Sequence, residues 1–157
     1  MLAVVAASTH VATRPMDSRA QEDPSPRAEL RLDAIVARHT DLQGGVGAAL
    51  PLGNYARFVV IGAVGTRFDA SAQELSGRVD LLGRFLLDPF MQSPRGVYGA
   101  AGLSALYVGD ERWRPLLVAL AGIEWSSRAQ FVPFLEVGYG GGVRLSVGLR
   151  RATTGRR

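Results

Sequence analysis

The sequence predicts an all-β protein: a closed antiparallel up-and-down β-barrel of about eight strands, with an apolar exterior and a charged interior. Apolar and polar residues alternate with a period of two from residue 28 to residue 150, as in strands with two unlike faces. Turn-forming residues interrupt this alternation seven times. One face of every segment lacks Asp, Glu and Arg. Segments joined by short turns pair as antiparallel hairpins, and closing such a meander removes its unpaired edges.

The composition limits the alternatives. A chain of 157 residues suggests one domain, and 47% hydrophobic residues is high for a sheet protein with one wetted face. The longest apolar run, Leu116 to Ile123, has eight residues, whereas a membrane-spanning helix needs about 20. If the chain crosses a bilayer, it must therefore do so as a closed barrel. Cys is absent, which excludes a disulfide framework and a thiolate metal site.

The eight predicted strands are residues 28–36, 42–52, 57–68, 75–88, 97–107, 113–125, 131–139 and 143–150. The fourth shows the alternation best, because its charges all fall on one side, whereas a helix with a period of 3.6 would spread them around its circumference. The second and fifth strands are predicted from apolar alternation alone. The charged residues opposite the apolar face are, in chain order, Glu29, Arg31, Asp33, Arg57, Arg67, Arg78, Asp80, Arg84, Asp88, Arg114, Glu124, Glu136, Arg144 and Arg150.

Turn chemistry predicts the connections between these strands. They are Thr40-Asp41, Gly53-Asn54, Asp69 to Glu74, Asp88 to Arg95, Gly109 to Arg112, Ser126 to Ala129 and Gly140 to Gly142. Residues 1–20 resemble a weak secretory signal, and an ordinary disordered tail is the alternative. Residues 21–27 read as a linker and residues 151–157 as a basic tail.

The charged face is expected to line the barrel's interior as an ion-pair network. Its eight arginines nearly balance its six acids, so almost complete pairing is possible. Eight strands enclose only enough space for side chains, and buried charges must be paired. Arg suits this role because its planar guanidinium binds carboxylates with two parallel hydrogen bonds.

Aromatic residues near strand ends predict that the apolar face contacts a membrane. Trp113 and Trp125 are twelve residues apart, which corresponds to about 30 Å of height in tilted strands and matches an apolar band with its two interfaces. The expected interface aromatics are Phe58, Phe68, Tyr107, Trp113, Trp125, Phe131 and Tyr139. In the alternative, a soluble lipocalin-like carrier barrel, these rings would form the core and the arginines a solvated face. Pro115 and Pro133 fit neither orientation well, since each removes a ladder donor.

In these features residues 28–150 resemble the small outer-membrane barrels of Gram-negative bacteria, the group that contains the transmembrane domain of outer-membrane protein A. The resemblance is architectural and rests on no short motif. It implies a bacterial outer-membrane location, with outer-membrane lipid and the barrel assembly machinery as partners. The chain departs from the group's pattern where its last strand ends at Val147 to Arg150 without a terminal aromatic residue, and where its connections are short.

We expect no catalytic residue, metal or cofactor, no specific ligand and no nucleic acid partner. The basic residues are scattered among acids and form no basic stripe. His39, Thr40 and Asp41 could be drawn as the triad of a lipid-modifying enzyme, but triad members usually come from separate segments. The leading hypothesis is a non-enzymatic envelope protein with a plugged lumen. A narrow anion-preferring pore, the soluble carrier and the lipid-modifying enzyme are the alternatives.

Overall fold

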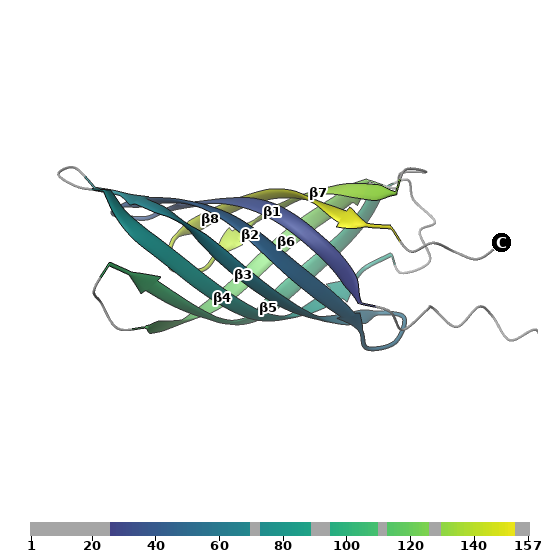
Figure 1. Ribbon diagram of the computed structural model, residues 1–157. Coiled ribbons are helices and arrows are strands. Elements are labelled where there is room, and N and C mark those ends of the chain that lie inside the picture. Colours follow the sequence, from purple (N-terminus) through teal and green to yellow (C-terminus); the bar gives the residue numbers. More distant parts are fainter. Residues whose placement is uncertain (1–25, 70–72, 89–94, 110–112, 126–129, 153–157) are drawn as a thin grey trace, which may run out of the picture.

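The computed structural model describes residues 26–69, 73–88, 95–109, 113–125 and 130–152. It contains eight strands: β1 (Arg27–Val36), β2 (Thr40–Pro51), β3 (Ala56–Phe68), β4 (Gln73–Leu86), β5 (Arg95–Val108), β6 (Arg114–Trp125), β7 (Phe131–Tyr139) and β8 (Val143–Arg151). Each strand pairs antiparallel with the next, and β1 pairs with β8 to close the barrel (Figure 1). The predicted fold class is confirmed. The possible signal at residues 1–20 lies outside the described residues.

Three predicted connections are wrong in their limits. Thr40 and Asp41 belong to β2 and pair with Val36 and Ile35, so the first turn is residues 37–39. Asp41 is extended because its carboxylate is held inside the barrel by Arg67, a tertiary contact that turn statistics do not contain. Strand β4 likewise begins two residues before Leu75, at Gln73. Strand β5 begins at Arg95, the predicted last residue of the connection Asp88 to Arg95. Residues 89–94, 110–112 and 126–129, which belong to three of the predicted connections, lie outside the described residues.

The strand register tilts the strands steeply around the barrel. Val36 of β1 pairs directly with Thr40 of β2. Following directly paired residues the other way around the barrel, from β1 to β8 and on through β3 to β2, leads instead to Leu50, which lies ten residues further along β2. The residues on this path are Val36, Val143, Tyr139, Ala119, Ala101, Gly83, Phe58 and Leu50. A stagger of this size in eight strands corresponds to a tilt of about 40°.

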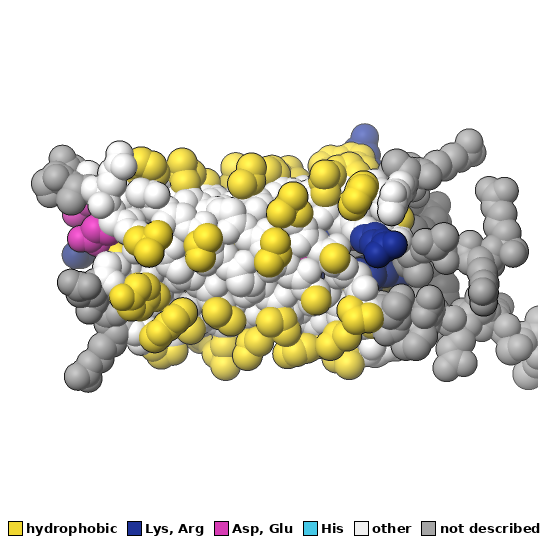
Figure 2. All heavy atoms as spheres, in the orientation of Figure 1, with side chains coloured by type: hydrophobic (Ala, Val, Ile, Leu, Met, Phe, Trp, Pro, Cys, Tyr) yellow, Lys and Arg dark blue, Asp and Glu magenta, His cyan; other side chains and the backbone are white. Residues whose placement is uncertain are grey.

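The two faces of the sheet differ in chemistry as the alternation predicts. Large apolar side chains are exposed around the outside of the barrel, and charged side chains are visible at its two ends (Figure 2). Arginines and carboxylates from several strands are buried inside. No helix in the described ranges is long and apolar enough to cross a membrane.

The seam between β6 and β7 is the shortest in the barrel. It has six residue pairs, from Ala119 with Tyr139 to Glu124 with Phe134. Because β7 ends at Tyr139, residues 114–118 of β6 pair with β5 but have no β7 partner among the described residues. The hairpin of β7 and β8 accordingly stops short of the end that the neighbouring strands reach (Figure 1).

This seam explains the positions of both prolines. Leu87 N–H donates to Val97 C=O, and Ala152 N–H donates to Gln130 C=O. The backbone groups of successive residues in a strand point to opposite sides, so these two bonds fix the direction of every backbone group in the neighbouring strands. By this register, the odd-numbered residues of β6 and β7 direct their backbone groups toward each other. The nitrogen of Pro115 therefore lies on the side where β7 is absent, and that of Pro133 lies beyond the last pair. Neither proline removes a donor from a formed pair, as expected for proline in sheets.

Candidate functional site: the ion-paired interior

The interior near the chain termini holds a cluster centred on Glu136 of β7. Its carboxylate accepts hydrogen bonds from Arg31 (2.5 Å), Arg150 (2.8 Å) and Arg84 (3.4 Å). Glu29 accepts from the same three arginines at 3.2, 2.9 and 3.1 Å. Each carboxylate therefore contacts guanidinium groups from β1, β4 and β8, which ties together strands that are far apart in sequence.

A second cluster lies further from the termini and is joined to the first through Arg31. The Nε of Arg31 donates to Asp33 at 3.0 Å, and Asp33 also binds Arg78 and, at 3.5 Å, Arg144. Asp80 lies 3.1 Å from Arg78 and 2.9 Å from Arg144 and accepts a bond of 2.6 Å from the Ser104 hydroxyl. The carboxylates of Glu29, Asp33, Asp80 and Glu136 are thus each shared by several donors, which offsets the cost of burying charge.

The charges of the two clusters balance. Five buried carboxylates (Glu29, Asp33, Asp80, Glu124 and Glu136) interact with five buried arginines (Arg31, Arg78, Arg84, Arg144 and Arg150). Arg57 is also buried inside the barrel. Arg67 is half-buried and binds Asp41 with two bonds of 2.9 and 3.0 Å.

Two charged residues predicted for the interior lie elsewhere. Arg114 has the inward parity but is the first residue of β6, where it is exposed at the barrel's end. Asp88 follows the end of β4 at Leu86 and is half-buried. Alternation gives the side of a strand on which a residue lies, but it does not show where the strand emerges into solvent.

Two inward-facing aromatic residues complete the cluster near the termini, and the sequence analysis missed them. Tyr98 pairs with Gly122 and Phe134 with Gly148, and a Cβ at either glycine would overlap the facing ring, at 2.2 and 2.6 Å. The Arg150 guanidinium lies 3.8 Å from the centre of the Phe134 ring and 4.7 Å from that of Tyr98. Both rings have the parity of the charged face, so considering aromatics on both faces would have found them.

The remaining interior space is filled by aliphatic side chains. Ala49, Val59, Ile61, Leu82, Ala100, Val118 and Leu120 form one buried cluster. Most of these residues come from β3 to β6, whereas most members of the charge clusters come from β1, β4, β7 and β8. The alternation in the sequence predicted an ion-pair network inside the barrel but did not predict this division.

The Tyr98 hydroxyl links the aromatic and charged parts of this interior. It donates to Glu136 at 2.8 Å and accepts from Arg150 at 2.7 Å. We expect Tyr98→Phe to lower the free energy of unfolding by about 1.5–3 kcal/mol, because two charged groups each lose a buried partner. Urea unfolding of the refolded protein in lipid vesicles measures this change. Tyr139→Phe, at an exposed position, is the control and should be neutral within about 0.5 kcal/mol.

The residues considered for catalysis do not form a triad. Asp41 is buried and engaged by Arg67, while the carboxylate near His39 is that of Asp69, with Oδ1 3.3 Å from His39 Nδ1. Within the described ranges, no three His, Asp or Glu side chains are grouped to hold a metal ion.

The exterior carries the seven predicted interface aromatics. Phe58, Trp125 and Phe131 lie near the end with the termini, and Phe68, Tyr107 and Trp113 lie near the opposite end. Tyr107 packs against Trp113 with ring centres 5.6 Å apart. Tyr139 ends the short strand β7 and pairs with Ala119, so it lies further from the end opposite the termini than Trp113 does.

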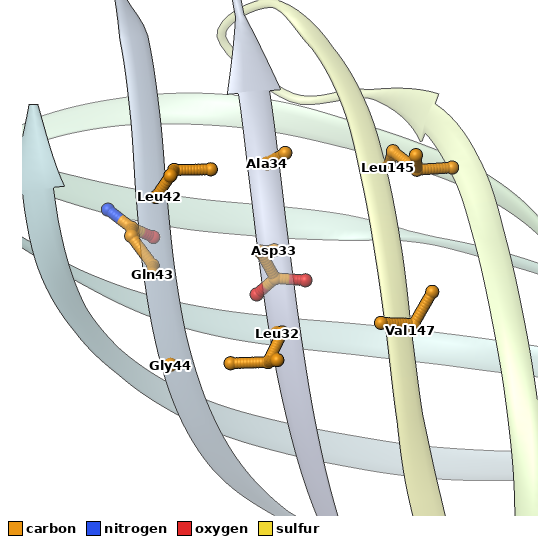
Figure 3. A pocket seen from close by; sticks show the side chains of 8 residues that line it. All are labelled: Leu32, Asp33, Ala34, Leu42, Gln43, Gly44, Leu145 and Val147. Atoms are coloured by element: carbon orange, nitrogen blue, oxygen red, sulfur yellow. The ribbon is translucent and has the colours of Figure 1, made fainter. Parts of the chain in front are cut away.

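A groove of about 370 Å³ lies on the outer face over β8, β1 and β2. Figure 3 shows the aliphatic side chains that line it, Leu32 and Ala34 of β1, Leu42 of β2 and Leu145 and Val147 of β8. Two polar residues, Asp33 and Gln43, also line it, but both are buried.

A closed eight-stranded antiparallel barrel with an apolar outer face and a balanced ionic interior is the architecture of small transmembrane barrels. The chain has the fold of outer-membrane barrels of this size. It is similar to the crystal structure of Neisserial surface protein A, with 17% identity and a TM-score of 0.57, over 80% of this chain and 94% of the other. It is also similar to a designed transmembrane β-barrel, with 17% identity and a TM-score of 0.54, over 83% and 97%. No protein-family model and no curated protein sequence matches.

Proposed function

We propose that this protein is an integral outer-membrane barrel with a structural role in the envelope, that its lumen conducts no ions, and that it is not an enzyme. The observation that carries the proposal is the packed interior, in which five arginines are ion-paired with five carboxylates and aliphatic side chains form a buried cluster beside them. Such a network makes the wall rigid and leaves the exterior as the surface available for contacts. Outer-membrane lipid and, during biogenesis, the barrel assembly machinery are its proposed partners.

The orientation of the exterior is tested by a charge on the apolar face. Leu32 lies near the middle of β1 and is 65% exposed. In a membrane, Leu32→Arg should lower the free energy of unfolding by about 2–4 kcal/mol, as for Arg near the bilayer midplane. If the same outer face were in contact with water, the substitution would leave stability nearly unchanged.

Fractionation and electrophoresis test the location. We expect the full chain in the outer-membrane fraction, extracted only by detergent, with faster gel migration before boiling than after. Full solubility in plain buffer would exclude the proposal. Planar bilayers containing the folded protein should show no conductance steps, and reproducible anion-selective steps would establish the pore instead.

A further inference from the structure

The edge of β6 extends past the end of the short strand β7. Residues 115–118 have no β7 strand partner among the described residues, and the register leaves the backbone groups of Pro115 and Leu117 directed toward this side. Leu117 is 78% exposed, more than its paired neighbour Leu103 on β5 at 58%. The Leu117 side chain beside this edge is therefore open to the outside of the barrel.

The depth of this edge in a membrane determines which molecules can contact it. Trp113 lies at the end of the apolar wall, and Leu117 follows four residues later, which places it about 10 Å further into the apolar belt in a strand tilted by about 40°. Pro115 lies about half as deep. In a membrane these are the depths between the headgroups and the upper acyl chains, where an unpaired backbone group is costly.

Among the described residues, no backbone hydrogen bond reaches Pro115 or Leu117 from the β7 side. The turn after β7 approaches the inner side of β6 through glycines: a Cβ at Gly140 would lie 3.0 Å from Val118, and one at Gly141 would lie 2.8 Å from Leu116. This contact is apolar packing against side chains. It seals the interior behind the edge but supplies no donor to the carbonyls of Pro115 and Leu117.

The chemistry of the edge favours a lipid over another strand. The carbonyls of Pro115 and Leu117 both point toward the unpaired side, but only Leu117 has an N–H there, because Pro115 has none. A docked strand needs donors and acceptors in alternation, and proline is a common means of preventing edge pairing. A lipid with an amide N–H or a hydroxyl at the base of its acyl chains would supply donors at this depth.

We propose that the β6 edge at Pro115 and Leu117 binds one lipid that carries an amide N–H or hydroxyl group next to its acyl chains. The donor bonds to the edge carbonyls, and the acyl chain packs against Leu117. The inference rests on the transmembrane placement proposed above.

Native mass spectrometry of the folded full chain tests the proposal with two lipids that share a phosphocholine headgroup. Sphingomyelin has an amide N–H and a hydroxyl at the required depth, and phosphatidylcholine has neither. From equimolar mixtures we expect the protein to retain sphingomyelin about fivefold to tenfold more, the effect of one or two hydrogen bonds. Leu117→Trp, which covers the edge, should abolish this preference.

Leu103→Trp is the matched control, since Leu103 faces outward directly opposite Leu117 on a strand paired on both sides. It should leave the preference unchanged. Equal retention of the two lipids by the unaltered protein would overturn the proposal, and so would an equal loss in both variants. A dimer that only Leu117→Trp separates would also overturn it and assign the edge to a second copy. If the proposed function is wrong, the unaltered protein will migrate at the same rate in gels before and after boiling.

Discussion

Glu136→Gln is expected to lower the free energy of unfolding by about 3–5 kcal/mol, the usual cost of removing one member of a buried ion-pair network. The substitution preserves shape but removes the charge that Arg31, Arg84 and Arg150 share. The remaining acids cannot move to compensate, because Glu29 and Glu124 already bind these arginines. Urea titration in phospholipid vesicles, followed by tryptophan fluorescence, measures the change.

A control variant and a double variant test whether the loss comes from the buried charge. Glu74→Gln removes an exposed carboxylate near the opposite end and should change stability by no more than about 0.5 kcal/mol. Combining Glu136→Gln with Arg31→Gln should recover part of the loss, since the pair interact directly and their effects are not additive. Additive losses would mean that the interior is hydrated enough to screen the two charges.

Gly65→Ala should be the most damaging single-methyl addition on β3, with a loss of about 3 kcal/mol or more, at or above the usual upper range for overpacking. A Cβ at Gly65 would lie 1.9 Å from the Leu42 carbonyl oxygen and 2.6 Å from the Gln43 Cα. Both are backbone atoms of the paired strand β2, so relief requires the strands to separate. The yield of folded barrel and its urea midpoint report the effect.

Gly62→Ala on the same strand is the matched control. Nothing lies within 4 Å of a Cβ at Gly62, so alanine should be neutral or stabilise by up to about 1 kcal/mol through the lower entropy of the unfolded chain. If the two variants behaved alike, the close approach of β2 and β3 at Gly65 would be contradicted.

The alternation in the sequence was enough to predict the fold and most of the charged interior. Strand β4 shows why: Arg78, Asp80 and Arg84 share a parity, and a side-chain period of two leaves them on one face wherever the strand lies. The near balance of Arg and acid then predicted pairing. The partners themselves could not be predicted, because Glu136 binds Arg31 across 105 positions of sequence and only the closure of β8 on β1 brings them together.

The sequence by itself determined the alternation, the number of strands and which side chains share a face, because these depend on local backbone geometry. Only the tertiary structure decided that Tyr98 and Phe134 face glycines inside, that Asp41 lies in a strand and that β7 stops early beside Pro115. These features depend on register and stagger, which are set by contacts between all eight strands at once. For the same reason two prolines that fitted neither orientation of the sheet prove to lie outside its shortest seam, Pro133 next to the last pair and Pro115 where β7 is absent.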